Sequence, residues 1–170
     1  RRSGGDQVAV AGATFFSGGT AFDLETGLLT TSVPGTRCPI IDAGVAYTGG
    51  KEVSAYDIAK PRTKTTKDRK GKTETKFSLA REWSSSISCD LFLKAGPWLY
   101  GSHDRKIVAI DLPDGTQDAR VAWKIPLEGV PAEGNVGSMI AANDRLVVVT
   151  TDGSISCYGP DPVDTPVEYP

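Results

Sequence analysis

The sequence predicts an all-β protein, a β-propeller of four-stranded antiparallel blades, with about four blades in these 170 residues. The main observation is a three-residue phrase that recurs along the chain. In each copy it closes a segment patterned as strand, tight turn, strand, tight turn, strand. Self-similarity at a spacing of a few tens of residues is typical of repeat architectures, in which each unit buries its apolar faces against its neighbours. The copies are Ala21-Phe22-Asp23, Ala55-Tyr56-Asp57 and Ala109-Ile110-Asp111, with a weaker fourth copy at Ser156-Cys157-Tyr158.

The expected blades span about 5–36, 37–88, 89–130 and 131–159. Ser-Gly-Gly, Gly-Gly, Asn-Asp and Asp-Gly sequences separate the strands, and these residues tolerate the positive φ of hairpin turns. No window keeps apolar residues three and four apart without an interrupting Gly or Pro, so almost no helix is expected. In the first expected blade the strands fall within 8–11, 14–16 and up to 23, and in the second within 40–50 and 53–57. In the third they fall within 91–101 and 106–111, and in the fourth within 139–158, with turns at 143–144 and 152–153.

Two of the repeated aspartates lead into a glycine, in Asp23-Leu24-Glu25-Thr26-Gly27 and Asp111-Leu112-Pro113-Asp114-Gly115, and the third copy continues to Trp123. This pattern resembles the blades of the quinoprotein-like (PQQ-like repeat) β-propellers over residues 5 to 159. That family includes the PQQ-dependent alcohol dehydrogenases and a non-catalytic lipoprotein of the outer-membrane protein assembly machinery. The second copy loses the glycine after Asp57, and the first has Leu28 to Thr31 where the family has a docking Trp. The chain therefore resembles the non-catalytic members more than the dehydrogenases.

The resemblance implies a ring of seven or eight blades, so this chain is expected to be about half a ring. It is either a fragment of a longer protein or a chain that completes its ring by pairing; a complete four-bladed propeller is the rarer alternative. A repeated residue serves the repeat, so alanines are expected to allow close packing of blades and aspartates to brace turns. If Trp123 is buried between blades, Trp123→Ala is expected to destabilise the fold by about 3 to 5 kcal/mol. The structural repeat positions are Ala21, Asp23, Gly27, Ala55, Asp57, Ala109, Asp111, Gly115 and Trp123.

The net charge of −2 hides a strong asymmetry. Residues 60–76 hold eight basic and two acidic residues, a local charge of +6 that leaves −8 on the rest of the chain. The segment is expected to form a solvated hairpin loop inserted into the second blade. It is either a plain surface loop or a contact for an anionic partner; no aromatic residues interleave to stack bases, so nucleic acid is not expected. The residues concerned are Lys60, Arg62, Lys64, Lys67, Arg69, Lys70 and Lys72.

The remaining chemistry-bearing residues are few. Cys38, Cys89 and Cys157 form no C-x-x-C motif, and buried small hydrophobes are favoured over a disulfide between the first two. The single histidine, His103, is expected in a tight turn. No apolar run reaches the ~18 residues of a membrane span. Residues 160–170 are expected to form a proline-rich, acidic tail or linker.

Two functions remain open. The first, which the sequence favours, is a non-catalytic module that acts as a protein-interaction or structural scaffold and needs no cofactor. Its partners would be other blades or domains of the same protein, or a second chain that completes the ring. The second is a portion of a PQQ- and calcium-dependent dehydrogenase, for which Asp90, Asp104, Asn135 and Trp98 are candidates, although none lies in a matching motif and no catalytic residue is assigned. Family resemblance implies an extracytoplasmic location in a bacterium.

Overall fold

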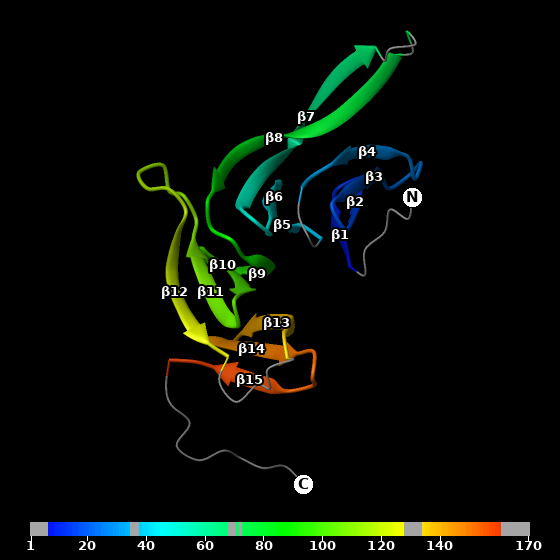
Figure 1. Ribbon diagram of the computed structural model, residues 1–170. Helices are drawn as coiled ribbons and strands as arrows, with labels where there is room; N and C mark the ends of the chain where they lie inside the picture. Colours follow the sequence, from blue (N-terminus) through cyan, green and yellow to red (C-terminus); the bar gives the residue numbers. More distant parts are fainter. Residues whose placement is uncertain (1–6, 35–37, 68–70, 72, 128–133, 161–170) are drawn as a thin grey trace. The chain divides into compact units, whose positions relative to one another are not determined.

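The computed structural model describes residues 7–34, 38–67, 71, 73–127 and 134–160, and all regular structure in these ranges is β-strand (Figure 1). The strands form four antiparallel sheets, and in each sheet consecutive strands are neighbours. Sheet 1 contains β1 (Val8–Ala11), β2 (Thr14–Ser17), β3 (Thr20–Asp23) and β4 (Leu29–Ser32). Sheet 2 contains β5 (Ile40–Asp42), β6 (Val45–Thr48), β7 (Val53–Lys67) and β8 (Thr73–Ser85). Sheet 3 contains β9 (Asp90–Ala95), β10 (Trp98–His103), β11 (Lys106–Asp111) and β12 (Arg120–Pro126), and sheet 4 contains β13 (Val136–Ala142), β14 (Arg145–Thr150) and β15 (Ile155–Tyr158).

The all-β class and the blade-like meanders are confirmed. Sheets 1 to 3 have four strands each, and the described residues supply three strands to sheet 4. The chain divides into two compact units, Arg1–Ile125 and Pro126–Pro170. Two-residue hairpin turns occur where predicted at Asn143-Asp144, with φ of 51° and 58°. This left-handed conformation matches the twist of the flanking strands.

The register of each sheet shows how the repeated phrase is used. Its middle residue pairs with the second residue of the preceding strand, as Phe22 does with Phe15 and Ile110 with Leu99. In sheet 4 the second residue of β14 is Leu146, and its partner is Tyr158. The fourth copy is therefore Cys157-Tyr158-Gly159, one residue later than the predicted Ser156-Cys157-Tyr158.

One hydrophobic cluster lies between sheet 1 and sheet 2. Phe16 is fully buried at its centre, and partly buried aliphatic residues of both sheets pack around it. Phe16 pairs with Ala21 across β2 and β3, so both side chains are on the face of sheet 1 that meets sheet 2. The buried members are Phe16, Ala21 and Val33 from the segment of sheet 1, and Ala46, Tyr56 and Leu79 from sheet 2.

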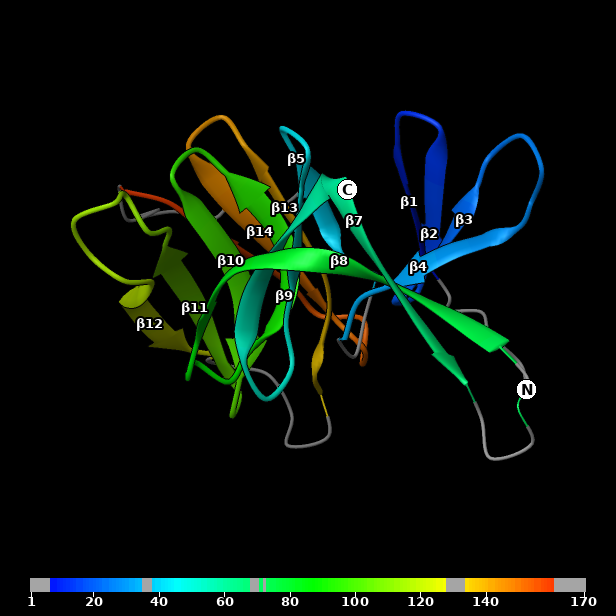
Figure 2. The ribbon, with the colours of Figure 1, turned by 90° about the horizontal axis from the view of Figure 1, so that it is seen from above.

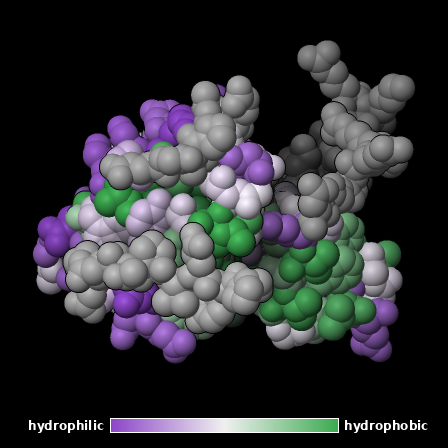
Figure 3. Space-filling model, turned by 90° about the horizontal axis from the view of Figure 1, so that it is seen from below, coloured by the Kyte–Doolittle hydropathy of each residue, from purple (hydrophilic) through white to green (hydrophobic). Residues whose placement is uncertain are grey.

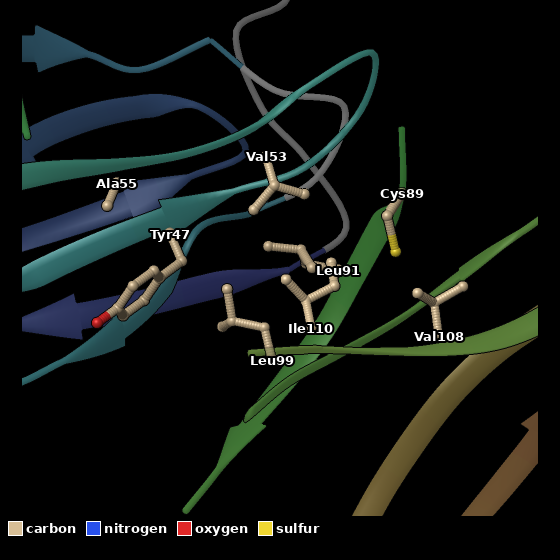
Figure 4. Packing of buried hydrophobic residues seen from close by; sticks show 8 residues of the cluster. All are labelled: Tyr47, Val53, Ala55, Cys89, Leu91, Leu99, Val108 and Ile110. Atoms are coloured by element: carbon tan, nitrogen blue, oxygen red, sulfur yellow. The ribbon is translucent and has the colours of Figure 1, made fainter. Parts of the chain in front are cut away.

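A second cluster lies between sheet 2 and sheet 3 (Figure 4). Leu99 and Ile110, which are register partners, are fully buried there and face Tyr47 and Ala55 of sheet 2. The backbones also meet, because the Cys89 carbonyl accepts the Gly50 N–H at 2.8 Å and the Gly50 carbonyl accepts the Cys89 N–H at 2.9 Å. The buried members are Tyr47, Val53, Ala55, Cys89, Leu91, Leu99, Val108 and Ile110.

The two clusters distinguish the faces of sheets 1, 2 and 3. We call the face that meets the following sheet in chain order the forward face, and the other the backward face. Side chains alternate between the faces along each strand. In sheet 2 the row of Ile41, Ala46 and Tyr56 lies on the backward face, and the row of Ile40, Tyr47 and Ala55 lies on the forward face. Both of these clusters thus join a forward face to a backward face.

Within the basic segment, residues 61–67 and 73–76 form a paired ribbon, so the predicted hairpin loop is regular β-structure over these residues. β7 and β8 continue beyond sheet 2 as two antiparallel strands, and Figures 1 and 2 show them projecting from it. A bulge separates ribbon from sheet, since pairing passes from Asp57↔Ala80 to Pro61↔Leu79. Threonines recur on both arms, and this β-branched residue favours extended backbone even without an apolar face. We call residues 61–67 and 73–79 the basic ribbon.

Candidate functional site

Each of the three repeated aspartates accepts hydrogen bonds from the chain that follows it or from a neighbouring strand. Asp23 Oδ1 accepts hydrogen bonds from the backbone N–H and the hydroxyl of Thr26, both at 2.7 Å. Asp57 accepts the Ala59 N–H at 2.8 Å and pairs with Lys60 Nζ at 2.6 Å. These carboxylates therefore act on local backbone, as Asx-type turns do.

Asp111 has different partners from the other two aspartates. Its Oδ1 accepts the indole Nε1–H of Trp98 at 2.6 Å, and its Oδ2 accepts Arg120 Nε–H at 3.0 Å. Trp98 and Asp111 are register partners on β10 and β11, while Arg120 begins β12. The carboxylate therefore joins three neighbouring strands of sheet 3. Nothing in the repeated phrase pointed to this indole contact.

The glycines and alanines of the repeat occupy restricted positions. Gly27 and Gly115 have φ of 68° and 87°, in the left-handed region that favours glycine. The three alanines are fully buried, so a larger side chain at these positions would have to displace a packed neighbour. They are Ala21, Ala55 and Ala109.

Trp123 lies on β12, the strand of sheet 3 farthest from β9. It is half-buried and packs edge-to-face on Tyr100, with ring centroids 5.8 Å apart. Tyr100 belongs to the same sheet, and it also packs on Trp98, at 6.2 Å. The ring contact of Trp123 that the structure gives therefore lies within a blade.

Replacing Trp123 with alanine is consequently expected to lower the free energy of unfolding by about 1 to 2 kcal/mol, because a half-buried ring loses part of its burial and one aromatic pair. Urea denaturation followed by far-UV circular dichroism measures this. A loss above about 3 kcal/mol would show that the indole is buried against another sheet after all.

Of the residues considered for a quinone and calcium, Trp98 lies away from Asp104. Trp98 begins β10, whereas Asp104 follows its last residue, His103, so the two lie at opposite ends of a six-residue strand. Asp90 pairs with Ser102, near the Asp104 end. Asn135 precedes β13 in the second compact unit. Within the described ranges, no group of three or more His, Cys, Asp or Glu residues is placed to hold a metal ion.

A hollow that the sequence did not predict lies beside the β6–β7 turn. It encloses about 300 Å³, and its acidic side chain, Glu52, is already engaged. Glu52 Oε1 accepts hydrogen bonds from Ser54 Oγ at 3.2 Å and from Arg81 at 3.3 Å. These contacts engage the carboxylate, and no chemistry is assigned to the hollow. Its lining is Pro34, Thr48, Gly49, Gly50, Lys51, Glu52 and Ser54.

The basic ribbon is the strongest charged feature. Arg62 is exposed on β7, and Lys60, just before the ribbon, is exposed and paired with Asp57. The register places Lys64 opposite Lys76, so basic residues of both arms belong to the same stretch of ribbon. Arg69, Lys70 and Lys72 lie outside the described residues.

Comparison with known proteins gives a fold. No family model matches the sequence, and no curated protein matches it. Among solved structures, the chain is similar to the crystal structure of the computationally designed Ika4 protein, with 15% sequence identity, a TM-score of 0.57, and coverage of 94% of this chain and 92% of that one. The fold is that of β-propeller blades. The likeness extends no further than fold, since the identity is low.

Seen as propeller blades, the repeat positions belong to the framework of the fold. The turns and the buried alanines recur from blade to blade, whereas the basic ribbon occurs in the second blade alone among the described residues. No helix of membrane-spanning length and hydropathy occurs in the described part of the chain.

Four turn carboxyls make the fold sensitive to acid. Hydrogen bonds from neighbouring threonines and serines lower the pKa of Asp23, Asp114 and Asp152, and the hydrogen bond from Lys60 lowers that of Asp57, from the ordinary 3.8. A folded-state pKa below the unfolded value stabilises the protein above the unfolded pKa and loses this contribution as pH falls through the folded one. We therefore expect constant stability between about pH 5 and pH 8 and a fall below about pH 4.

Urea midpoints measured across this range test that expectation. The variant Asp114→Asn serves as the comparison, because Asp114 accepts three hydrogen bonds from Thr116 and Gln117. Its midpoint should fall less between pH 5 and pH 3 than that of the parent chain. A parent midpoint that rises on acidification would contradict the assigned direction of the pKa shifts.

Proposed function

We propose that this chain is a non-catalytic β-propeller module that acts as a protein-interaction scaffold, with the basic ribbon as its docking element. The observation that carries the proposal is the ribbon itself. Its strands have 15 and 13 residues, whereas the longest of the other described strands have seven, and the extension carries the positive charge of a chain that is otherwise negative. A long, paired extension that carries mainly positive charge on a rigid framework is well suited to bind a partner of opposite charge.

The chemistry of the ribbon favours an acidic protein surface. A concentration of lysine and arginine attracts anionic partners over a Debye length and raises the association rate. The strands are already ordered by cross-strand pairing, so binding costs less conformational entropy than folding a free loop would. Residues 60–76 contain no aromatic side chain to stack on bases, which argues against single-stranded nucleic acid.

A binding measurement with a fluorescein-labelled polyglutamate peptide tests the proposal. We expect saturable binding by fluorescence anisotropy, weakened as salt is raised. Substituting Arg62, Lys64 and Lys67 by glutamate should raise the dissociation constant more than about tenfold. The matched control, with the exposed Lys51, Lys106 and Lys124 substituted by glutamate, has the same net charge and should change it less than about threefold.

The outcomes separate cleanly. No binding by the parent chain, or an equal loss in the ribbon and control variants, would overturn the assignment of the ribbon as docking element. Tighter binding of a double-stranded DNA oligonucleotide than of polyglutamate would replace the acidic-protein partner by nucleic acid. Circular dichroism of each variant confirms that the sheets persist.

The finer identity of the module is also part of the proposal. The Ala-x-Asp phrase, with its buried alanine and turn-bracing aspartate, supports a non-catalytic PQQ-like repeat, and with it an extracytoplasmic location. Adding PQQ together with Ca²⁺ is then expected to leave the melting temperature unchanged. A rise of several degrees that requires both additions would favour the alternative, a portion of a quinone-dependent dehydrogenase.

A further inference from the structure

Sheet 1 has an uncovered backward face. The register aligns Val10, Phe15, Phe22 and Leu29 across its four strands, on the face opposite Phe16. Val10 is 58% and Leu29 55% exposed, and the rings of Phe15 and Phe22 stack with centroids 5.0 Å apart. In Figure 3 hydrophobic surface gathers on the side of the molecule where sheet 1 lies.

This row is built like the backward faces that are covered. It occupies the same register positions as Ala46 and Tyr56 of sheet 2 and as Leu99 and Ile110 of sheet 3. Those residues are buried against the forward face of the preceding sheet. The backward face of sheet 1 thus has the composition of an inter-blade interface, although Val10 and Leu29 on it are exposed.

In sheet 4 the exposed face corresponds by register to a forward face, because Tyr158 pairs with Leu146 as Ile110 pairs with Leu99. The register aligns Ile140, Val147 and Cys157 across its three strands, with Ile155 beside them opposite Val149. Ile140 is 59% and Ile155 71% exposed, and the Cys157 thiol is exposed. The opposite, backward row of Met139, Leu146 and Val148 is buried. Apolar surface of this extent on two sheet faces is unfavourable in water.

We propose that two copies of this chain pair head to tail, with the forward face of sheet 4 of each copy seated on the backward face of sheet 1 of the other. Both hydrophobic clusters between described sheets of the first unit join a forward to a backward face, and the two exposed faces are one of each kind. A two-fold pair forms this contact twice and covers all four apolar faces. Pairing sheet 1 with sheet 1 would join two backward faces and leave sheet 4 uncovered.

The inference goes beyond the proposed docking role of the basic ribbon. The ribbon residues are not part of either apolar row, so the polyglutamate experiment and the assembly experiment can fail separately. The inference rests on the two exposed apolar faces, and a second copy of this chain is the partner proposed to cover them.

Sedimentation equilibrium of the full chain, from nanomolar to high micromolar concentration, measures the assembly. We expect a reversible dimer of twice the 18.0 kDa chain mass. Val10→Glu on sheet 1 and Ile155→Glu on sheet 4 should each shift the equilibrium to monomer, because a charge buried in an apolar interface is strongly unfavourable. The control Val121→Glu changes an exposed valine on β12, outside both faces, and should leave the dimer intact.

Mixing the two interface variants tests the head-to-tail direction. Val10→Glu keeps an intact sheet 4 face and Ile155→Glu keeps an intact sheet 1 face, so the mixture should form a weak heterodimer through one contact while each variant alone stays monomeric. A dimer that is insensitive to Ile155→Glu would overturn the proposal, since it would arise from sheet 1 alone. All three variants should keep the circular dichroism spectrum of the parent chain, as their positions are exposed.

The thiols give an independent readout. Cys157 lies on the proposed interface, so its alkylation should slow as the concentration of the chain rises. Cys89 is the internal reference, because burial raises its pKa to about 12 and keeps it unreactive in the fold. A chain that stays monomeric at all concentrations overturns the proposal. If Cys157 is then protected from alkylation, the two apolar faces meet within one chain. If Cys157 is alkylated readily, the faces stay uncovered.

Discussion

Replacing Phe16 with alanine is expected to lower the free energy of unfolding by about 3 to 5 kcal/mol. The side chain is fully buried between sheet 1 and sheet 2, where it meets a cluster that includes Tyr56 and Leu79. Its removal takes away the largest apolar group of that cluster and leaves a cavity that two hydrogen-bonded sheets cannot close. Urea denaturation at neutral pH, at a concentration where the chain is monomeric, measures the loss.

Phe15 provides the matched control for this prediction. It is the adjacent aromatic residue on the same strand, but it lies on the uncovered backward face and stacks on Phe22. Phe15→Ala should therefore cost less than about 1.5 kcal/mol in the monomer. Equal losses at the two positions would mean that sheet 1 is not packed on sheet 2 through the Phe16 face.

Replacing Gly49 with alanine is expected to cost about 3 kcal/mol, although only one methyl group is added. A Cβ at this position would lie inside van der Waals contact with the Cys89 carbonyl oxygen and 2.9 Å from the Leu91 nitrogen. Both are backbone atoms of the neighbouring blade, so no side chain can move aside. The hydrogen-bonded bridge between Gly50 and Cys89 would have to open.

Gly137→Ala is the control for this substitution. A Cβ there would meet the Val149 carbonyl oxygen at 3.4 Å, which is ordinary contact, and the change in stability should stay below about 1 kcal/mol. Thermal unfolding of both variants, with hydrogen exchange at the Gly50 and Cys89 amides, distinguishes a local opening from a general loss. A tolerated Gly49→Ala would show that sheets 2 and 3 are farther apart than described.

The repeated phrase predicted most of the fold, because it combines three independent signals: a small residue, an apolar residue and a carboxylate that braces a turn. Where all three are present, as at Ala109 and Asp111, strand, register and turn all follow. The fourth copy lacks both the alanine and the aspartate, and a strand pattern of period two then leaves the register ambiguous by one residue. Pairing of Tyr158 with Leu146 resolved it.

Other features could not be read from the sequence, for identifiable reasons. The basic ribbon has no alternation of apolar and polar residues, so its pairing rests on threonine propensity and on continuity with sheet 2. The Trp98–Asp111 hydrogen bond depends on cross-strand proximity between residues 13 apart in the chain. Val10 and Leu29 look like core residues of any strand. A sequence shows that a sheet face is apolar, but it does not show which surface covers that face.

The single direction of blade packing has a consequence for assembly into larger particles. A contact that joins unlike faces closes only when the rotation between successive blades adds up to a full circle. Otherwise the same contact continues from chain to chain and produces an open filament. A substitution between two sheets, such as one at Phe16 or Gly49, alters that rotation slightly, so light scattering of such variants would detect a change from closed particles to growing polymers even where each chain remains folded.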